Sequence, residues 1–88
     1  MMKGKRVVLT GASSGLGAAL AHTLAEQGAK LALFATHPER LETVAQECRA
    51  SGAEVLVDTG DVAQAKDVQA AVLRAAEAWG GIDFVIAN

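Results

Sequence analysis

Short apolar runs alternate with longer amphipathic segments along the whole chain. The first, second and fourth runs are continuously apolar at their centres, as in "VVL", "LALF" and "FVIA". Unbroken apolar runs are typical of strands that are buried on both faces of a parallel sheet. The pattern therefore predicts four strands, at residues 6–10, 30–35, 54–58 and 84–87.

The three segments between these runs carry apolar residues at helical spacing, which predicts helices over residues 15–27, 38–51 and 64–79. Thr36 and Glu39 fit a capping box at the start of the second helix. The positions expected to face inward are Leu16, Leu20, Leu24, Leu41, Val44, Ala45, Cys48, Val68, Ala71, Val72, Ala75 and Trp79.

The order of the predicted elements is strand-helix-strand-helix-strand-helix-strand. Connections that contain a helix make successive strands parallel. Right-handed crossovers then give a doubly wound α/β sheet, with the first two helices on one face and the third on the other. We predict a partial Rossmann-type domain with strand order 3-2-1-4, in which residues 84–87 form an exposed edge.

The stretch "TGASSGLG" between the first strand and the first helix contributes few side chains to a core. A tight turn needs one glycine, but this stretch has three, at Gly11, Gly15 and Gly17. Small residues at a helix N-terminus let a phosphate approach the free backbone N–H groups, and Ser13 and Ser14 add hydroxyl donors. The stretch therefore predicts a site for a dinucleotide pyrophosphate.

Three motifs together resemble the short-chain dehydrogenase/reductase family: "TGASSGLG", "GDV" at residues 60–62 and "IDFVIAN" at residues 82–88. They occur in order, at the spacing that this family uses, over the whole chain. The resemblance implies NAD(P)-dependent oxidation of an alcohol or reduction of a carbonyl. We expect residues 1–88 to be the amino-terminal part of one NAD(P)-binding Rossmann domain, broken off within the family's Asn-Asn-Ala-Gly motif.

The resemblance also implies roles for single residues. Asp61 would accept a hydrogen bond from the adenine amino group, with Val62 beside it, although Asp61 is also suited to capping the third helix. Asn88 matches the second Asn of the family motif, near the nicotinamide-side ribose, while Ala87 replaces the first. The residues that would line the pyrophosphate and the adenosine ribose are Gly11, Ser13, Ser14, Gly15, Leu16 and Gly17.

The end of the second strand favours NADP over NAD. An NAD enzyme usually places an acidic residue there to hold the ribose 2′-hydroxyl, and the matching position is Ala35. Thr36, His37 and Arg40 offer donors for a 2′-phosphate, while Glu39 would oppose it if turned inward. If Thr36 only caps the helix, the site would accept both cofactors.

The residues that carry catalysis in this family, a Ser and a Tyr-x-x-x-Lys pair, have no match here, and the sequence contains no tyrosine. We therefore expect no catalytic residue in this chain, with Asn88 bordering the active site. A non-catalytic dinucleotide-binding or sensor protein of the same fold is the alternative. A relative of sugar-nucleotide epimerases is disfavoured by the close spacing of Gly15 and Gly17.

Composition and charge narrow the classes of partner. The 88 residues allow one small domain, and a net charge of −2 without a long run of one sign disfavours nucleic acid and anionic membranes. The single Cys48 favours a reducing, cytoplasmic location, and no apolar stretch approaches a membrane span. His and Cys do not cluster at metal-binding spacing. We expect a small-molecule alcohol or carbonyl substrate, no metal, and a homo-oligomer when intact.

Overall fold

The computed structural model describes residues 2–88 and contains the predicted elements in the predicted order. Their boundaries differ from the predicted ones by one residue at most. The elements are β1 (Arg6–Thr10), α1 (Gly15–Glu26), β2 (Lys30–Ala35), α2 (Pro38–Ala50), β3 (Val55–Thr59), α3 (Ala65–Trp79) and β4 (Phe84–Ile86).

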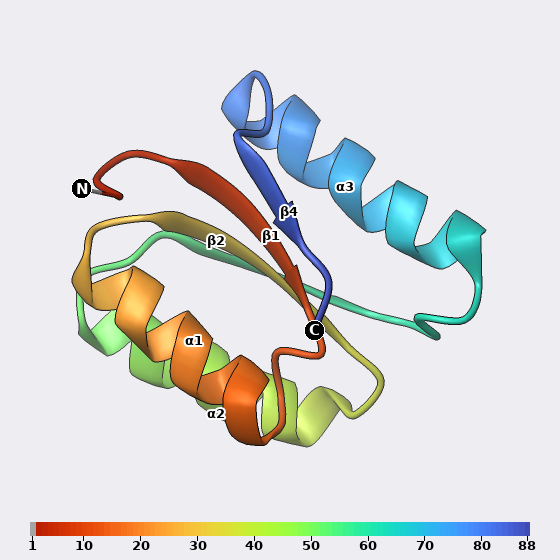
Figure 1. The fold of residues 1–88 in the computed structure, drawn as a ribbon, viewed down its shortest axis with the longest axis horizontal. Coiled ribbons are helices and arrows are strands. Elements are labelled where there is room, and N and C mark those ends of the chain that lie inside the picture. The colour runs from red at the N-terminus through yellow and green to blue at the C-terminus, as the bar shows by residue number, and fades with distance from the viewer. Residues whose placement is uncertain (1) are drawn as a thin grey trace.

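The four strands form one parallel sheet in the order β3-β2-β1-β4, as predicted. Val8 in β1 pairs with Ala32 in β2 on one side and with Val85 in β4 on the other. Helices α1 and α2 cover one face of the sheet and α3 covers the other (Figure 1). All four strands therefore end at the same edge, where the loops that follow them come together.

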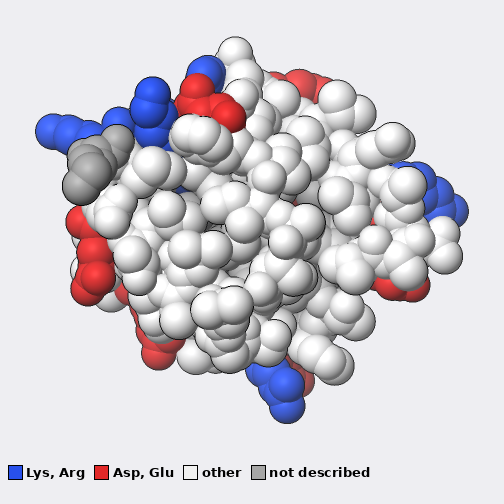
Figure 2. Space-filling model, in the orientation of Figure 1, with Lys and Arg blue, Asp and Glu red and all other residues white. Residues whose placement is uncertain are grey.

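The two central strands are buried on both faces, as their unbroken apolar runs predict. In β1, Val7 and Leu9 pack toward α1 and α2, while Val8 packs toward α3. Strand β4 is the expected exposed edge, with Phe84 and Val85 about half exposed at 47% and 53%. In the view of Figure 2, charged side chains lie mostly at the rim, and the middle of the face is uncharged.

The inward face of α1 differs from the predicted leucine stripe. Leu16 is 76% exposed, and the buried positions of the helix are Gly17, Ala21, Leu24 and Ala25. The helix starts within the stretch "TGASSGLG", residues 10–17, which we call the glycine turn. Only small residues therefore fit between the first turns of the helix and the sheet. Because successive helical residues point about 100° apart, burying Gly17 turns Leu16 outward.

Two predicted helix caps are wrong. Helix α2 begins after His37 rather than Thr36, and the His37 side chain makes no capping hydrogen bond. Helix α3 begins after Gln64, so Asp61 does not cap it. Asp61 instead accepts a hydrogen bond from the Ala63 backbone N–H at 2.9 Å, which forms a short turn ahead of the helix.

No helix within residues 2–88 combines the length and the apolar character needed to cross a membrane.

An ion pair joins the start of β1 to the residue before β4. It lies at the amino ends of the strands, opposite the end where the loops converge. The Asp83 carboxylate accepts hydrogen bonds from the Arg6 backbone N–H at 2.8 Å and from the guanidinium at 3.0 and 3.1 Å. The Asp83 N–H in turn donates to the Arg6 carbonyl at 2.8 Å. Hydrogen bonding from the Arg6 side chain and backbone holds the pKa of Asp83 far below its ordinary range.

We expect Asp83→Asn to lower the melting temperature at neutral pH. A carboxyl group whose pKa is lower in the folded protein stabilises the fold above its unfolded pKa, about 4, and loses that contribution as the pH falls through the folded value. The difference from wild type should therefore be constant near pH 7 and narrow below about pH 4. Glu26→Gln, which removes an exposed carboxylate on α1, is the control. A difference that stays constant down to strongly acidic pH would contradict this role.

Candidate functional site

A cavity of about 260 Å³ lies where the loops after the four strands converge. It contains most of the site residues predicted from the sequence; Gly15, Leu16, Gly17 and Asp61 are outside its lining. The lining consists of Gly11, Ser13, Ser14, Ala35, Thr36, His37, Arg40, Val62 and Asn88.

The three glycines of the turn meet different requirements. Gly11 adopts φ +65°, a left-handed conformation that glycine favours. Gly17 lies so close to the turn that an added Cβ would be 1.9 Å from the Gly11 carbonyl oxygen. Gly15 has φ +38°, but the space around it is open. The turn is therefore closed by backbone contact between α1 and the end of β1.

The N-terminus of α1 is suited to an anion. Ser14 is the residue before the helix, its hydroxyl makes no capping bond, and it lines the cavity. The first turn of α1, which the structure describes in full, carries no acidic side chain. The free N–H groups and the positive end of the helix dipole are thus left uncompensated beside the cavity.

Asn88 ties the end of β4 to the glycine turn. Its backbone N–H donates to the Thr10 side-chain oxygen, and its side-chain Nδ2 donates to the Gly11 carbonyl, both at 3.2 Å. Thr10 is buried, and no role was predicted for it from the sequence. The only signal for Thr10 was its place beside the first glycine, which did not reveal that a residue 78 positions away contacts it.

The loop between β2 and α2 contributes Thr36, His37 and Arg40 to the lining of the cavity, and all three are exposed. Glu39 lines a neighbouring hollow of about 300 Å³, together with His37, Pro38 and Arg40, and not the glycine-turn cavity. Among the residues that the structure describes, no Asp or Glu lines the glycine-turn cavity.

The loop between β3 and α3 supplies Val62, which lines the cavity and is 52% exposed. Asp61 precedes it, and its backbone N–H donates to the Asp67 carboxylate at 3.1 Å. Asp67 was not predicted from the sequence, because a carboxylate in the first turn of an amphipathic helix is an ordinary feature of such helices.

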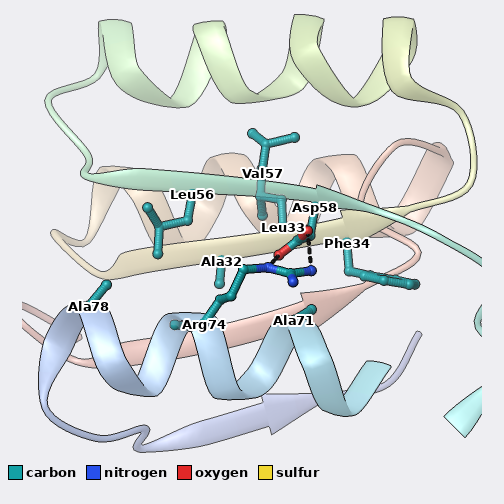
Figure 3. Close-up of a pocket in the computed structure, with 10 residues that line it drawn as sticks. Ala32, Leu33, Phe34, Leu56, Val57, Asp58, Ala71, Arg74 and Ala78 are labelled. Atoms are coloured by element: carbon teal, nitrogen blue, oxygen red, sulfur yellow. Dashed lines mark hydrogen bonds and ion pairs between the residues drawn. The ribbon is translucent and has the colours of Figure 1, made fainter. Parts of the chain in front are cut away.

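A larger hollow of about 400 Å³ lies elsewhere, between α3 and strands β2 and β3 (Figure 3). Its lining is mostly alanine, leucine and valine. Arg74 reaches from α3 to Asp58 on β3, with hydrogen bonds of 2.7 and 2.5 Å. Because these charges pair with each other, the hollow offers no free donor set for a diphosphate.

Within residues 2–88, no group of three or more His, Cys, Asp or Glu side chains is arranged to hold a metal ion.

We expect Gly17→Ala to destabilise the fold more than Gly15→Ala. The added methyl at Gly17 collides with backbone, which costs upward of about 2 kcal/mol, whereas at Gly15 only conformational strain of about 1 kcal/mol arises. Urea unfolding of both variants measures this order.

Gly52→Ala is the control for strain alone, since Gly52 has φ +93° and open surroundings beyond the end of α2. If Gly17→Ala unfolded at the same urea concentration as Gly15→Ala, the backbone contact would not be the constraint that we describe.

Comparison with known proteins places these features in a family. A family model described as short chain dehydrogenase matches residues 5–88. An uncharacterized oxidoreductase of Listeria innocua is 41% identical over 87 residues, which are 99% of this chain and 35% of that protein.

Among solved structures, NAD+-bound xylitol dehydrogenase matches with a TM-score of 0.90 and 33% identity, over 96% of this chain and 32% of its own. A variant of actinorhodin polyketide ketoreductase with NADPH matches with a TM-score of 0.89 and 30% identity, over 97% and 33%. The chain thus spans about a third of the length of these proteins. Because the family model matches nearly every residue and the same parallel sheet recurs in these structures, the chain belongs to the short-chain dehydrogenase family.

Proposed function

We propose that residues 1–88 form the amino-terminal, cofactor-binding part of an NAD(P)-dependent oxidoreductase that interconverts an alcohol and a carbonyl. The observation that carries this proposal is the cavity at the carboxyl edge of the sheet, which is lined by residues that follow each of the four strands. The related xylitol dehydrogenase binds NAD+ and the related ketoreductase binds NADPH, which supports a nicotinamide dinucleotide here.

In this proposal, the pyrophosphate lies against the N-terminus of α1. Gly11 lets the backbone approach closely, the Ser13 and Ser14 hydroxyls donate, and the first N–H groups of the helix face the anion. Gly15, Leu16 and Gly17 complete the stretch that would line the pyrophosphate and the adenosine ribose, although they lie outside the lining of the cavity. The bound nicotinamide supplies the hydride chemistry, while the chain binds and orients it through Asn88 and the loops.

We extend the proposal to a preference for NADP(H). A carboxylate would repel a 2′-phosphate, and Glu39 lines the neighbouring hollow rather than the cavity. Thr36, His37 and Arg40 present a hydroxyl, an imidazole and a guanidinium on the cavity side of the β2–α2 loop. The alternative, a site that accepts both cofactors, assumed that Thr36 only caps α2. His37, not Thr36, is the residue before the helix.

The proposal includes a small-molecule substrate and a homo-oligomer of the full-length protein in the cytoplasm. Leu73 on α3 and Phe84 and Val85 on β4 are exposed apolar side chains, which either the rest of the full-length protein or a second copy would cover. The buried, unpaired thiol of Cys48 is consistent with a reducing compartment.

Full-length protein containing these residues should bind NADP+ more tightly than NAD+ in calorimetric titrations at matched ionic strength. Arg40→Ala should weaken NADP+ binding about tenfold, the usual effect of losing one hydrogen bond to a charged group, and leave NAD+ binding nearly unchanged. Lys66→Ala removes the same charge from the surface of α3 and serves as the control. Tighter binding of NAD+ would refute the preference, and an unchanged NADP+ affinity in Arg40→Ala would exclude that side chain.

A chain of these 88 residues alone should not catalyse hydride transfer, because it contains no tyrosine to act as the family's general acid. The assay follows cofactor absorbance with a panel of ketones and alcohols, beside a full-length member of the family as the positive control. Turnover well above the buffer blank would overturn this part of the proposal.

A further inference from the structure

Val62, in the loop between β3 and α3, lines the cavity. A side chain outside the cavity, that of Asp67, forms a hydrogen bond to this loop. The Asp67 carboxylate oxygen Oδ2 accepts a hydrogen bond from the Asp61 backbone N–H at 3.1 Å. Asp67 belongs to the first turn of α3, where its own N–H donates to the Gln64 carbonyl at 3.0 Å. The helix therefore fixes the carboxylate that the loop uses as an acceptor.

Asp61 is fixed at three atoms. Besides its N–H, its carboxylate oxygen Oδ1 accepts from Ala63 N–H at 2.9 Å, and its carbonyl accepts from Gln64 N–H at 2.9 Å. The last two contacts are local, within three residues, and would move with the loop. The contact with Asp67 ties the N–H of Asp61 to the first turn of the helix.

Gly60 is packed between Asp67 and the core. A Cβ added at Gly60 would be 2.9 Å from the Phe34 ring and 3.1 Å from Asp67 Oδ2. The Gly60 N–H donates to the Ala35 carbonyl at 3.2 Å, which fastens the loop to the end of β2. Asp67 therefore supports the loop from the helix side while β2 supports it from the sheet side.

The position of the Gly60–Val62 loop affects which ligand groups fit in the cavity. Val62 lines the cavity, and Asp61 directly precedes it. If Asp67 did not accept the Asp61 N–H, the attachment of the loop to the first turn of α3 through that bond would be lost, while the bond to β2 and the local turn would remain. The carboxylate is also favoured where it lies, near the positive end of the α3 dipole.

We propose that Asp67 is a positioning residue that sets the adenine selectivity of the site by holding the Gly60–Val62 loop. The proposal rests on the proposed function together with the role that the family resemblance implies for Asp61, which is to accept a hydrogen bond from the adenine amino group. Asp67 does not touch the base, and it acts through the Asp61 backbone.

The test compares NADP+ with nicotinamide hypoxanthine dinucleotide phosphate, in which an oxygen replaces the adenine amino group. Calorimetric titration of the full-length protein gives the ratio of the two affinities, which should favour NADP+ about tenfold in the wild type. Asp67→Ala should reduce the ratio toward one. Asp67→Asn keeps an oxygen acceptor and should retain most of the ratio, as should the control Glu77→Ala near the far end of α3.

The two variants distinguish a failure of the adenine contact of Asp61 from a failure of the role of Asp67. If Asp61→Ala leaves the ratio unchanged, the adenine contact of the proposed function is wrong, and the role of Asp67 falls with it. If Asp61→Ala abolishes the ratio and Asp67→Ala preserves it, only the role of Asp67 is overturned.

A measurement on the wild type does not depend on the folding of any variant. Hydrogen exchange should show the Asp61 amide protected by its bond to Asp67. Exchange of that amide at the rate of an unprotected one would also overturn the proposal.

Discussion

The contact between the first turn of α1 and the glycine turn is the constraint on which the rest of the site depends. A Cβ at Gly17 would be 1.9 Å from the Gly11 carbonyl oxygen and 2.7 Å from the Asn88 side-chain nitrogen. The missing side chains therefore let a helix, a turn and the end of a distant strand meet at one point. Without that close approach, the helix N-terminus would not open directly onto the cavity that we assign to a pyrophosphate.

Different contacts hold β4 at the amino ends and at the carboxyl ends of the strands. At the amino end of the strands, Arg6 and Asp83 join β1 to the entry of β4 through charge-assisted hydrogen bonds. At the carboxyl end, Asn88 donates to Thr10 and to the glycine turn. The ion pair fixes where β4 begins, and the short parallel pairing of β4 with β1 then delivers Asn88 to the site.

The hollow beneath α3 has the larger volume, whereas the cavity at the carboxyl ends of the strands has the free hydrogen-bond donors and positive charge. Volume and charge therefore favour different places for a ligand. The hollow beneath α3 is mostly apolar, and its Arg74 and Asp58 side chains pair with each other. The smaller cavity at the carboxyl ends of the strands is lined by an uncompensated helix N-terminus and by Arg40. For an anionic dinucleotide, free donors matter more than volume, because a diphosphate must recover the hydrogen bonds that it loses on leaving water.

The sequence by itself determined the family, the order of the elements, the strand order and most of the residues around the cavity. These follow from local periodicity, from crossover handedness and from glycines at fixed spacing, all of which act over short stretches of chain. The tertiary structure alone decided that Leu16 faces solvent, that Glu39 lines a different hollow from the glycine turn, and that Asp67 supports Asp61. Each of these depends on how a helix is rotated and seated against its neighbours, and close packing rather than spacing along the chain sets that rotation.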